Sequence, residues 1–354
     1  MKNDRLERYA FINAKLRTRL SLILPDEFFL RLSRTATLNE AVELLKETPF
    51  SAAGRVYAAT GDLKLVELEL FTIQLGLYRE LQKQVKGELL IFLNALLLRL
   101  EIENLKEALR LWLDRSVRCR DISSPLGYLF QGSICHEIDI SRVVNAEDIQ
   151  ALQAALDGTP YAVLVAADAE EILRSSSLFS LETDLDRFYF AHVLEASAGL
   201  GGEDRGIVER IVGIEIDLEN LERLVRFRSF YGFDAGQIRR SLIPGGYRID
   251  PEEVLSSIGT QDPREIPSAV TRSYPELTAL GGPGKDSSSR LLLLEEFLRQ
   301  VLFREVTRLL GGNPFTVGII LAYFSIKNRE VRRIATILNA KNYGLGEEAI
   351  GRYL

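Results

Sequence analysis

Apolar residues recur at steps of three and four along most of the chain, as at Leu6, Tyr9 and Leu16. This spacing places them on one face of a helix, and the strict alternation typical of half-buried strands is hard to find. The strand-like run at 162–167 follows Pro160 and continues into a polar helical pattern, so we interpret it as helix too. The pattern predicts an all-α protein.

The most apolar stretch lies near the C-terminus, where the twelve residues from Phe315 to Ile326 carry no charge. A bilayer span needs about 20 apolar residues, so the stretch predicts a helix buried inside the protein. Pro314 suits the first helical position, and Asn313 suits the N-cap before it. Beyond Lys327 polar and apolar residues alternate at helical spacing, which predicts an amphipathic helix.

Three sets of markers recur along the chain, with steps of 110 to 116 residues. They are the polar markers Asn104, Asn220 and Glu330, the aromatic markers Phe50, Tyr161 and Tyr274, and the acidic markers Glu69, Glu182 and Glu295. A shared period indicates an internal repeat. It predicts three divergent helical lobes, 1–120, 121–235 and 236–354, in a pseudo-threefold arrangement around a concavity. Gly, Pro and Ser predict the joints at 123–127 and 232–236.

Length and charge limit the classes of function. A chain of 354 residues exceeds the size at which one core keeps growing, and 46% hydrophobic residues permit a large folded interior. The formal net charge of −6 disfavours nucleic acid as a partner. The charged N-terminus lacks the apolar segment of a signal peptide, so we expect a cytosolic protein. We expect Cys119 and Cys135 to be free thiols.

Candidate ligand sites are weak. The loop Gly281–Ser287 resembles a phosphate-binding loop but lacks its first glycine and has Asp286 directly after the lysine. We interpret it as a loop that caps the next helix. Cys119, Cys135 and His136 lack the paired spacing of a structural zinc site, even with Asp139 included.

Candidate catalytic groups are equally weak. Glu69, Glu182 and Glu295 could in principle converge as catalytic acid and base. The simpler interpretation is that a repeated unit inherited one acidic residue three times, because the helix dipole favours acidic residues in the first turn of a helix. His192 lies on a helix face, where a core or boundary histidine is the ordinary interpretation. The sequence predicts no catalytic residue, no metal site, no cofactor and no small-molecule substrate.

Basic residues cluster after each polar marker. The clusters are Arg110, Arg115, Arg118 and Arg120, then Arg223, Arg226 and Arg228, then Arg329, Arg332 and Arg333. Solvated helix faces are the ordinary interpretation. The alternative is an electrostatic rim that meets an acidic protein partner.

The segment 313–334 resembles the C-terminal signature of the C subunit of archaeal and bacterial A/V-type ATP synthases, a family related to the d subunit of eukaryotic vacuolar ATPases. Asn313 stands where that family has Asp, and Lys327 to Glu330 replace its usual polar turn. The segments 8–17 and 242–247 resemble the same family, so the resemblance spans the whole length.

The resemblance implies a funnel-like socket in the central rotor that joins stalk subunits D and F to the membrane proteolipid ring. Such a component is not catalytic, because ATP is made or hydrolysed in the A and B subunits. It transmits rotation coupled to proton or sodium ion transport, as a peripheral protein on the cytoplasmic face of the membrane. Within the signature, Arg329, Arg332 and Arg333 are the predicted partner contacts.

Two alternatives follow from the residues alone. The first is an all-α tripartite adaptor scaffold that binds a partner helix in a concave groove. The second is an enzyme, which would need a deep pocket with convergent polar groups.

Overall fold

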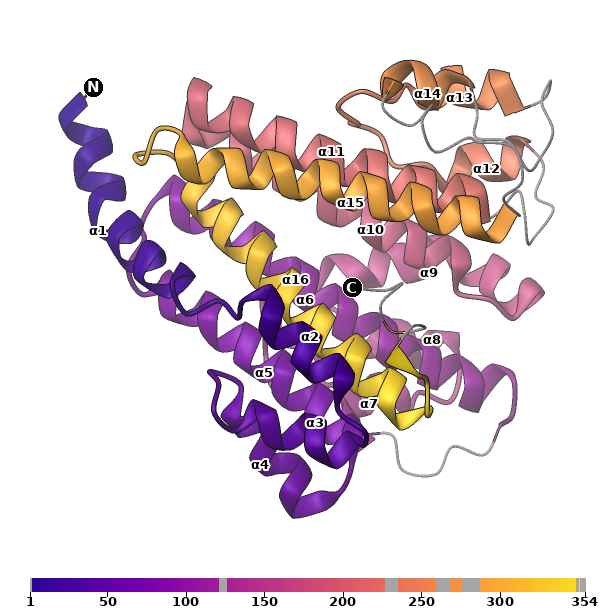
Figure 1. The fold of residues 1–354 in the computed structure, drawn as a ribbon. Helices are drawn as coiled ribbons and strands as arrows, with labels where there is room; N and C mark the ends of the chain where they lie inside the picture. Colours follow the sequence, from indigo (N-terminus) through magenta and orange to yellow (C-terminus); the bar gives the residue numbers. More distant parts are fainter. Residues whose placement is uncertain are drawn as a thin grey trace. The chain divides into compact units, whose positions relative to one another are not determined.

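Figure 1 shows the fold of the chain as a computed structural model. The structure describes residues 2–120, 126–226, 235–258, 268–275, 287–347 and 350. Within these ranges every regular element is a helix, and none of the residues lies in a strand. The predicted all-α class is confirmed, and the run at 162–167 lies inside helix α9.

The contacts divide the chain into two units, Met1–Leu178 with Ile319–Leu354, and Phe179–Gly318. The first unit contains α1 (Lys2–Leu20), α2 (Asp26–Arg34), α3 (Leu38–Leu45), α4 (Ser51–Thr60), α5 (Leu63–Gln82), α6 (Glu88–Trp112), a π-helical turn (Leu113–Val117), a 3₁₀ turn (Leu126–Tyr128), α7 (Ile140–Val144), α8 (Ile149–Ala155), α9 (Pro160–Ser175) and nearly all of α16 (Gly318–Asn342).

The second unit contains α10 (Phe179–Ser197), a 3₁₀ turn (Ala198–Leu200), α11 (Gly202–Arg226), α12 (Ala235–Ser241), α13 (Pro251–Ile258), α14 (Ser268–Ser273) and α15 (Ser287–Gly311). Its apolar core joins α11, α12, α13 and α14, with Leu221, Ile238 and Tyr274 among its buried members. The three predicted lobes stay a prediction, and their joints fall mostly on residues outside the described ranges.

Three helices of equal length carry the polar markers. Helices α6, α11 and α16 each have 25 residues and contain Asn104, Asn220 and Glu330 respectively. Each follows another long helix, namely α5, α10 or α15. The sequence repeat therefore corresponds to a recurring pair of long helices.

The start of α16 differs from the sequence prediction, since the helix begins at Gly318 and not at Pro314. Asn313 Oδ1 accepts the N–H of Phe315 at 3.1 Å, so Asn313 stabilises a turn before the helix. The buried carboxylate of Asp204 accepts the N–H of Val317 at 2.9 Å. These bonds hold the chain in a turn past Pro314 and delay the start of the helix by about one helical turn.

The acidic markers also differ from expectation. Glu182 lies in the first turn of α10, but neither α5 nor α15 has an acidic residue in its first turn. Helix α5 starts early because Asp62 Oδ1 accepts the N–H of Lys64 at 2.8 Å and acts as its N-cap. The helix-dipole explanation holds for Glu182 and is wrong for Glu69 and Glu295.

Residues from both ends of the chain share one core in the first unit. Phe29 and Leu45, from α2 and α3, belong to the same buried cluster as Ile334 and Leu338 from α16. Of the stretch predicted to be buried, residues 316–324 are buried, whereas Phe315, Ser325 and Ile326 are half-buried. Helix α16 therefore completes the core of the N-terminal helices.

Candidate functional site

The three predicted contact residues lie on α16 in the first unit. Arg332 is exposed, and Arg329 is half-buried. Arg333 is only 15% exposed, because its guanidinium pairs with Asp26 at 2.6 Å and lies 3.9 Å from the centre of the Phe29 ring. Of the three, Arg332 is the side chain best placed to meet a partner, and the contact role itself stays a prediction.

A buried carboxylate on α6 fixes the segment that leads to α7. Glu101 is 3% exposed, and its Oε2 accepts the N–H groups of Cys135 at 2.6 Å and His136 at 2.7 Å. Its Oε1 accepts the hydroxyl of Tyr161 at 2.7 Å and lies 2.6 Å from Nδ1 of His136. Burial, reinforced by the charge of Glu101, raises the pKa of Tyr161 well above its ordinary value, so the tyrosine stays a donor.

One turn further along α6, Asn104 binds the same segment through its side-chain amide. Its Nδ2 donates to the carbonyl of Phe130 at 2.9 Å, and its Oδ1 accepts the N–H of Phe130 at 3.0 Å. We call the contacts of Glu101 and Asn104 the first junction. Buried groups that satisfy one another in this way hold a loop in one conformation.

The second unit repeats this arrangement on α11. Asp217 is fully buried and accepts the N–H groups of Arg248 at 2.8 Å and Ile249 at 3.3 Å. Its Oδ2 also accepts the hydroxyl of Tyr274 at 2.8 Å. Burial raises the pKa of Asp217 above its ordinary value, although the hydrogen bonds that the carboxylate accepts oppose the shift.

Asn220 completes this second junction as Asn104 completes the first. It exchanges two hydrogen bonds of 2.7 Å with the backbone of Ile243. A Cβ at Gly246 would lie 2.2 Å from Oδ1 of Asp217, and Gly245 has φ +95°. Gly246 is thus required by the close approach of the backbone to the carboxylate, and Gly245 is favoured by its positive φ.

A third junction in the first unit uses different chemistry. Oε1 of Glu330 on α16 accepts the N–H of Leu24 at 2.8 Å. The ammonium of Lys327, one turn earlier, bonds to Glu330 and lies 4.5 Å from the centre of the Phe50 ring. Phe50 has no hydroxyl, and here it faces a cation where Tyr161 and Tyr274 each face a carboxylate.

The sequence repeat identified only some of the residues that form each junction. The polar and aromatic markers all take part in the junctions, but Glu101, Asp217 and Lys327 were missed. Each missed residue lies three positions before a polar marker and is buried on a long helix. A charged residue one turn before the marker, on the apolar face, is the signal that would have found them.

The thiols and histidines of the chain are separated or occupied. Cys119 is exposed, while burial and the nearby Glu101 carboxylate raise the pKa of Cys135 to about 12. A thiol with so high a pKa is a poor nucleophile at neutral pH. His192 is exposed and stacks on Phe188 at 5.4 Å. Among the described residues, no group of three or more His, Cys, Asp or Glu side chains could hold a metal ion.

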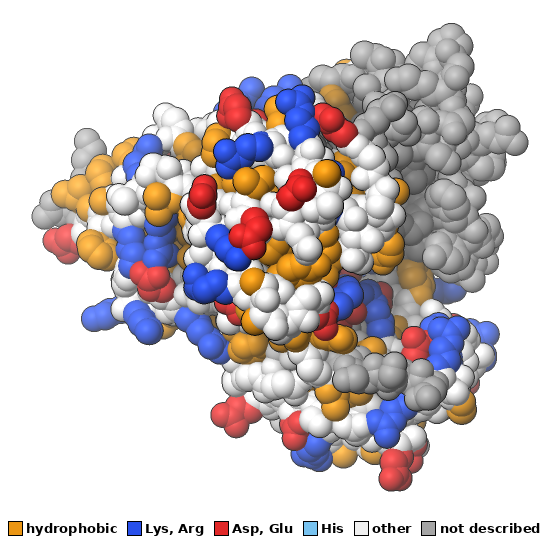
Figure 2. Space-filling model, turned by 60° about the horizontal axis from the view of Figure 1, so that its bottom comes forward, with side chains coloured by type: hydrophobic (Ala, Val, Ile, Leu, Met, Phe, Trp, Pro, Cys, Tyr) orange, Lys and Arg blue, Asp and Glu red, His pale blue; other side chains and the backbone are white. Residues whose placement is uncertain are grey.

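The surface and the helices add two observations. On the face drawn in Figure 2, basic and acidic side chains are interspersed, with hydrophobic side chains visible between them. Within the described part of the chain, every helix is either too short or too polar to cross a bilayer. A surface of mixed charge suits protein partners better than a polyanion.

Residues 12–353 match the family described as the ATP synthase (C/AC39) subunit. The chain belongs to the ATP synthase (C/AC39) subunit family. The match covers nearly the whole chain, including all three junctions. The resemblance to the C subunit family of A/V-type ATP synthases is thereby confirmed.

Among its relatives is the C subunit of the A-type ATP synthase of Methanosarcina mazei, 25% identical over 97% of this chain and 91% of that protein. The protein of the same name from Methanosphaera stadtmanae is 22% identical over 94% of this chain and 84% of its own length. That of Methanosarcina acetivorans is 24% identical over 99% of this chain and 93% of its own. This C/AC39 chain therefore resembles these proteins over most of their length.

Proposed function

We propose that this C/AC39 protein is a non-catalytic central-rotor subunit of an A/V-type ATP synthase. In this role it is a socket that joins stalk subunits D and F to the membrane proteolipid ring. It lies as a peripheral protein on the cytoplasmic face of the membrane and transmits rotation coupled to proton or sodium ion transport. The family match over residues 12–353 carries this proposal.

The buried junctions support a mechanical role. A part that transmits torque must keep its helices and loops in register, and close-packed interiors transmit strain well. Glu101 and Asp217 each bind two backbone N–H groups of a loop to a long helix, and Glu330 binds one, all away from solvent. Local opening of such loops is disfavoured, because it would expose or orphan a buried carboxylate.

The arrangement of reactive groups supports a non-catalytic role. Cys135 and His136 are neighbours, but the pKa of the thiol lies at about 12 and the imidazole Nδ1 faces Glu101. A hollow of ≈ 440 Å³ in the second unit is bordered by Arg210, Arg308 and Glu305, whose charges pair with one another. These groups are used in structural contacts within the fold.

Co-purification with stalk subunits D and F tests the proposal. We expect the tagged chain to retain both proteins at about 0.15 M salt, where surface charges still act over about 8 Å. Absence of any association with D and F under these conditions would refute the assignment to the rotor.

A charge reversal tests the contact surface separately. Arg332→Glu should weaken retention of the stalk proteins, whereas Arg55→Glu, at another exposed helical arginine on α4, should leave it unchanged. Equal retention by the two variants would refute the contact role of Arg332 and leave the assignment to the rotor standing.

A further inference from the structure

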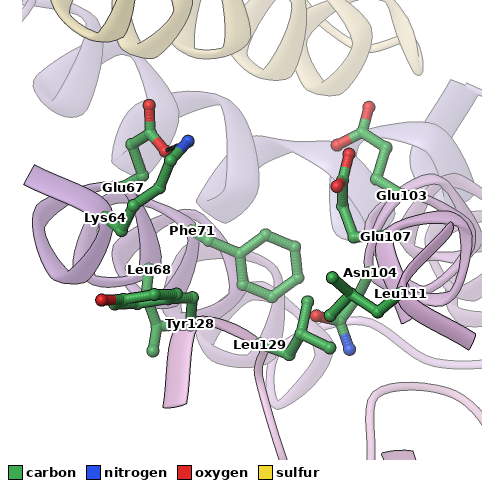
Figure 3. A pocket seen from close by; sticks show the side chains of 10 residues that line it. All are labelled: Lys64, Glu67, Leu68, Phe71, Glu103, Asn104, Glu107, Leu111, Tyr128 and Leu129. Carbon is green, nitrogen blue, oxygen red and sulfur yellow. Dashed lines mark hydrogen bonds and ion pairs between the residues drawn. The ribbon is translucent and has the colours of Figure 1, made fainter. Parts of the chain in front are cut away.

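A groove with no assigned role lies in the first unit between α5 and α6. Its volume is ≈ 520 Å³, and both helices together with residues 128 and 129 line it. Figure 3 shows the ring of Phe71 between Lys64 and Glu67 on one side and Glu103 and Glu107 on the other.

The floor of the groove is apolar. Leu68 and Phe71 come from α5, Leu111 comes from α6, and Leu129 closes the lower side. Phe71, Leu68 and Leu111 are each half-buried, so the chain leaves part of this apolar area exposed to water. An apolar area rimmed by polar groups is typical of a binding surface for another protein.

The first junction holds this floor in place. Asn104, which lines the groove, exchanges two hydrogen bonds with the backbone of Phe130, directly after Leu129. The ring of Phe130 lies 5.7 Å from that of Phe71. The groove is therefore preformed, which reduces the entropy lost when a partner binds.

The rim of the groove is acidic. Three carboxylates, Glu67, Glu103 and Glu107, line it together with a single ammonium, that of Lys64. Lys64 pairs with Glu67 at 2.7 Å, and Glu67 and Glu107 raise its pKa, so its charge is already compensated. On the α6 wall Glu103 and Glu107 are both exposed, and Glu107 pairs with Arg110 at 2.5 Å. Three carboxylates against the two cations Lys64 and Arg110 leave the rim with a net negative charge, carried on the α6 wall by Glu103.

We propose that this groove binds an amphipathic α-helix of a partner protein, with Leu-like side chains on the floor and Lys or Arg beside Glu103 and Glu107. The lining residues of the two helices are 64, 67, 68 and 71 on α5 and 103, 104, 107 and 111 on α6. They span about two helical turns, which is the length that anchors at i, i+3, i+4 and i+7 of a docked helix would occupy. The proposal does not depend on the rotor assignment.

A designed peptide tests the proposal with the full chain. The probe is a fluorescent helical peptide of about eighteen residues, with Leu on one face and Lys on the other. A second peptide, which serves as the control, carries Glu in place of Lys. Fluorescence anisotropy should show binding of the Lys peptide and no binding of the Glu peptide. A photoreactive group on the Leu face should cross-link to α5 or α6.

Variants of the rim supply the decisive comparison. The double variant Glu103→Lys with Glu107→Lys should weaken binding of the Lys peptide by about tenfold or more and favour the Glu peptide. The matched control is Glu171→Lys, because Glu171 pairs with Arg174 at i+3 on α9 as Glu107 pairs with Arg110 on α6. It should bind the Lys peptide as the wild type does, and circular dichroism should show that all variants are folded.

Several results would overturn the proposal. These are absence of binding to the Lys peptide, equal binding of both peptides, an unchanged affinity in the double variant, or cross-links confined to other helices. Self-association of the chain that is abolished by the double variant would assign the groove to a second copy and would also refute a partner helix.

Discussion

The hydroxyl of Tyr161 donates a hydrogen bond of 2.7 Å to Oε1 of Glu101, sixty positions earlier in the chain. Tyr274 makes the same bond to Asp217, at 2.8 Å and across 57 positions. In both cases the carboxylate also accepts two successive backbone N–H groups from the intervening loop. The fold thus closes two loops by the same arrangement of donors around one buried charge.

Removal of either hydroxyl should destabilise the protein. Tyr161→Phe and Tyr274→Phe each leave a buried carboxylate with one donor fewer, which costs about 1.5–3 kcal/mol for a bond to a charged group. Chemical denaturation should show this loss. Tyr343→Phe, at a tyrosine 76% exposed, is the control and should change the stability little. An unchanged denaturation midpoint in both junction variants would contradict the role of the hydroxyls.

The third junction predicts a rescue. Lys327→Met leaves the carboxylate of Glu330, 2% exposed, without its cation, and breaking a buried pair costs about 3–5 kcal/mol. Adding Glu330→Gln removes the orphaned charge and keeps an acceptor for the N–H of Leu24, so we expect much of the loss to be recovered. Thermal unfolding of the single and double variants measures this.

The control for that rescue is an exposed pair with the same spacing. Lys46 and Glu43 form an i,i+3 pair at the surface, and Lys46→Met should cost only about 0–1 kcal/mol. If the double variant at 327 and 330 proves less stable than Lys327→Met alone, the buried charge is not the source of the loss.

How much of the fold and of the junctions can be predicted from the sequence depends on how far apart in the chain the interacting residues lie. Helical periodicity is local, so the all-α class and the long helices were predicted correctly. The start of α16 was predicted wrongly, because the N–H of Val317 is bound by the carboxylate of Asp204, 113 positions away. Propensity at Asn313 and Pro314 carries no information about so distant an acceptor.

The repeat markers show a similar limit. Their period indicated which positions are equivalent, but not which copies touch. Tyr161 contacts the helix of the preceding marker, Asn104, while Phe50 contacts α16 at the other end of the chain. The first two junctions each combine a Glu or Asp with an Asn, whereas the third combines a Lys with a Glu. Only the fold reveals that Phe50 accompanies this exchange.

Two glycines should respond in opposite directions to alanine. Gly246→Ala would place a Cβ 2.2 Å from Oδ1 of Asp217 and 3.1 Å from the carbonyl oxygen of Ile249, so we expect a loss of about 1–3 kcal/mol. Gly76 lies inside α5 with no atom within 4 Å of an added Cβ, and its replacement should stabilise the helix by about 0.5–1 kcal/mol. Denaturation midpoints measure both, and a neutral Gly246→Ala would contradict the close approach.

The ion pairs that hold α1 to α5 should depend on pH in a defined direction. Glu80 on α5 pairs with Lys15 at 2.6 Å and with Arg19, and these two partners lower the pKa of Glu80 below its ordinary value of 4.5. A carboxylate with a lowered pKa contributes stability above the pKa of the unfolded chain and loses it as the pH falls through the folded value. Its contribution is therefore present at pH 7 and fades in acid below 4.5.

Glu80→Gln tests this sign. At pH 7 and low salt the variant should be less stable than the wild type by about 0.5–1 kcal/mol, because the side chain of Glu80 is partly exposed and solvent screens the pairs. The difference in melting temperature should shrink as the pH falls below 4.5, and it should also shrink in Lys15→Met, which lacks one of the two cations. A difference that grows on acidification would mean that Glu80 is bound more tightly in its protonated form and would refute the pairing as the source of stability.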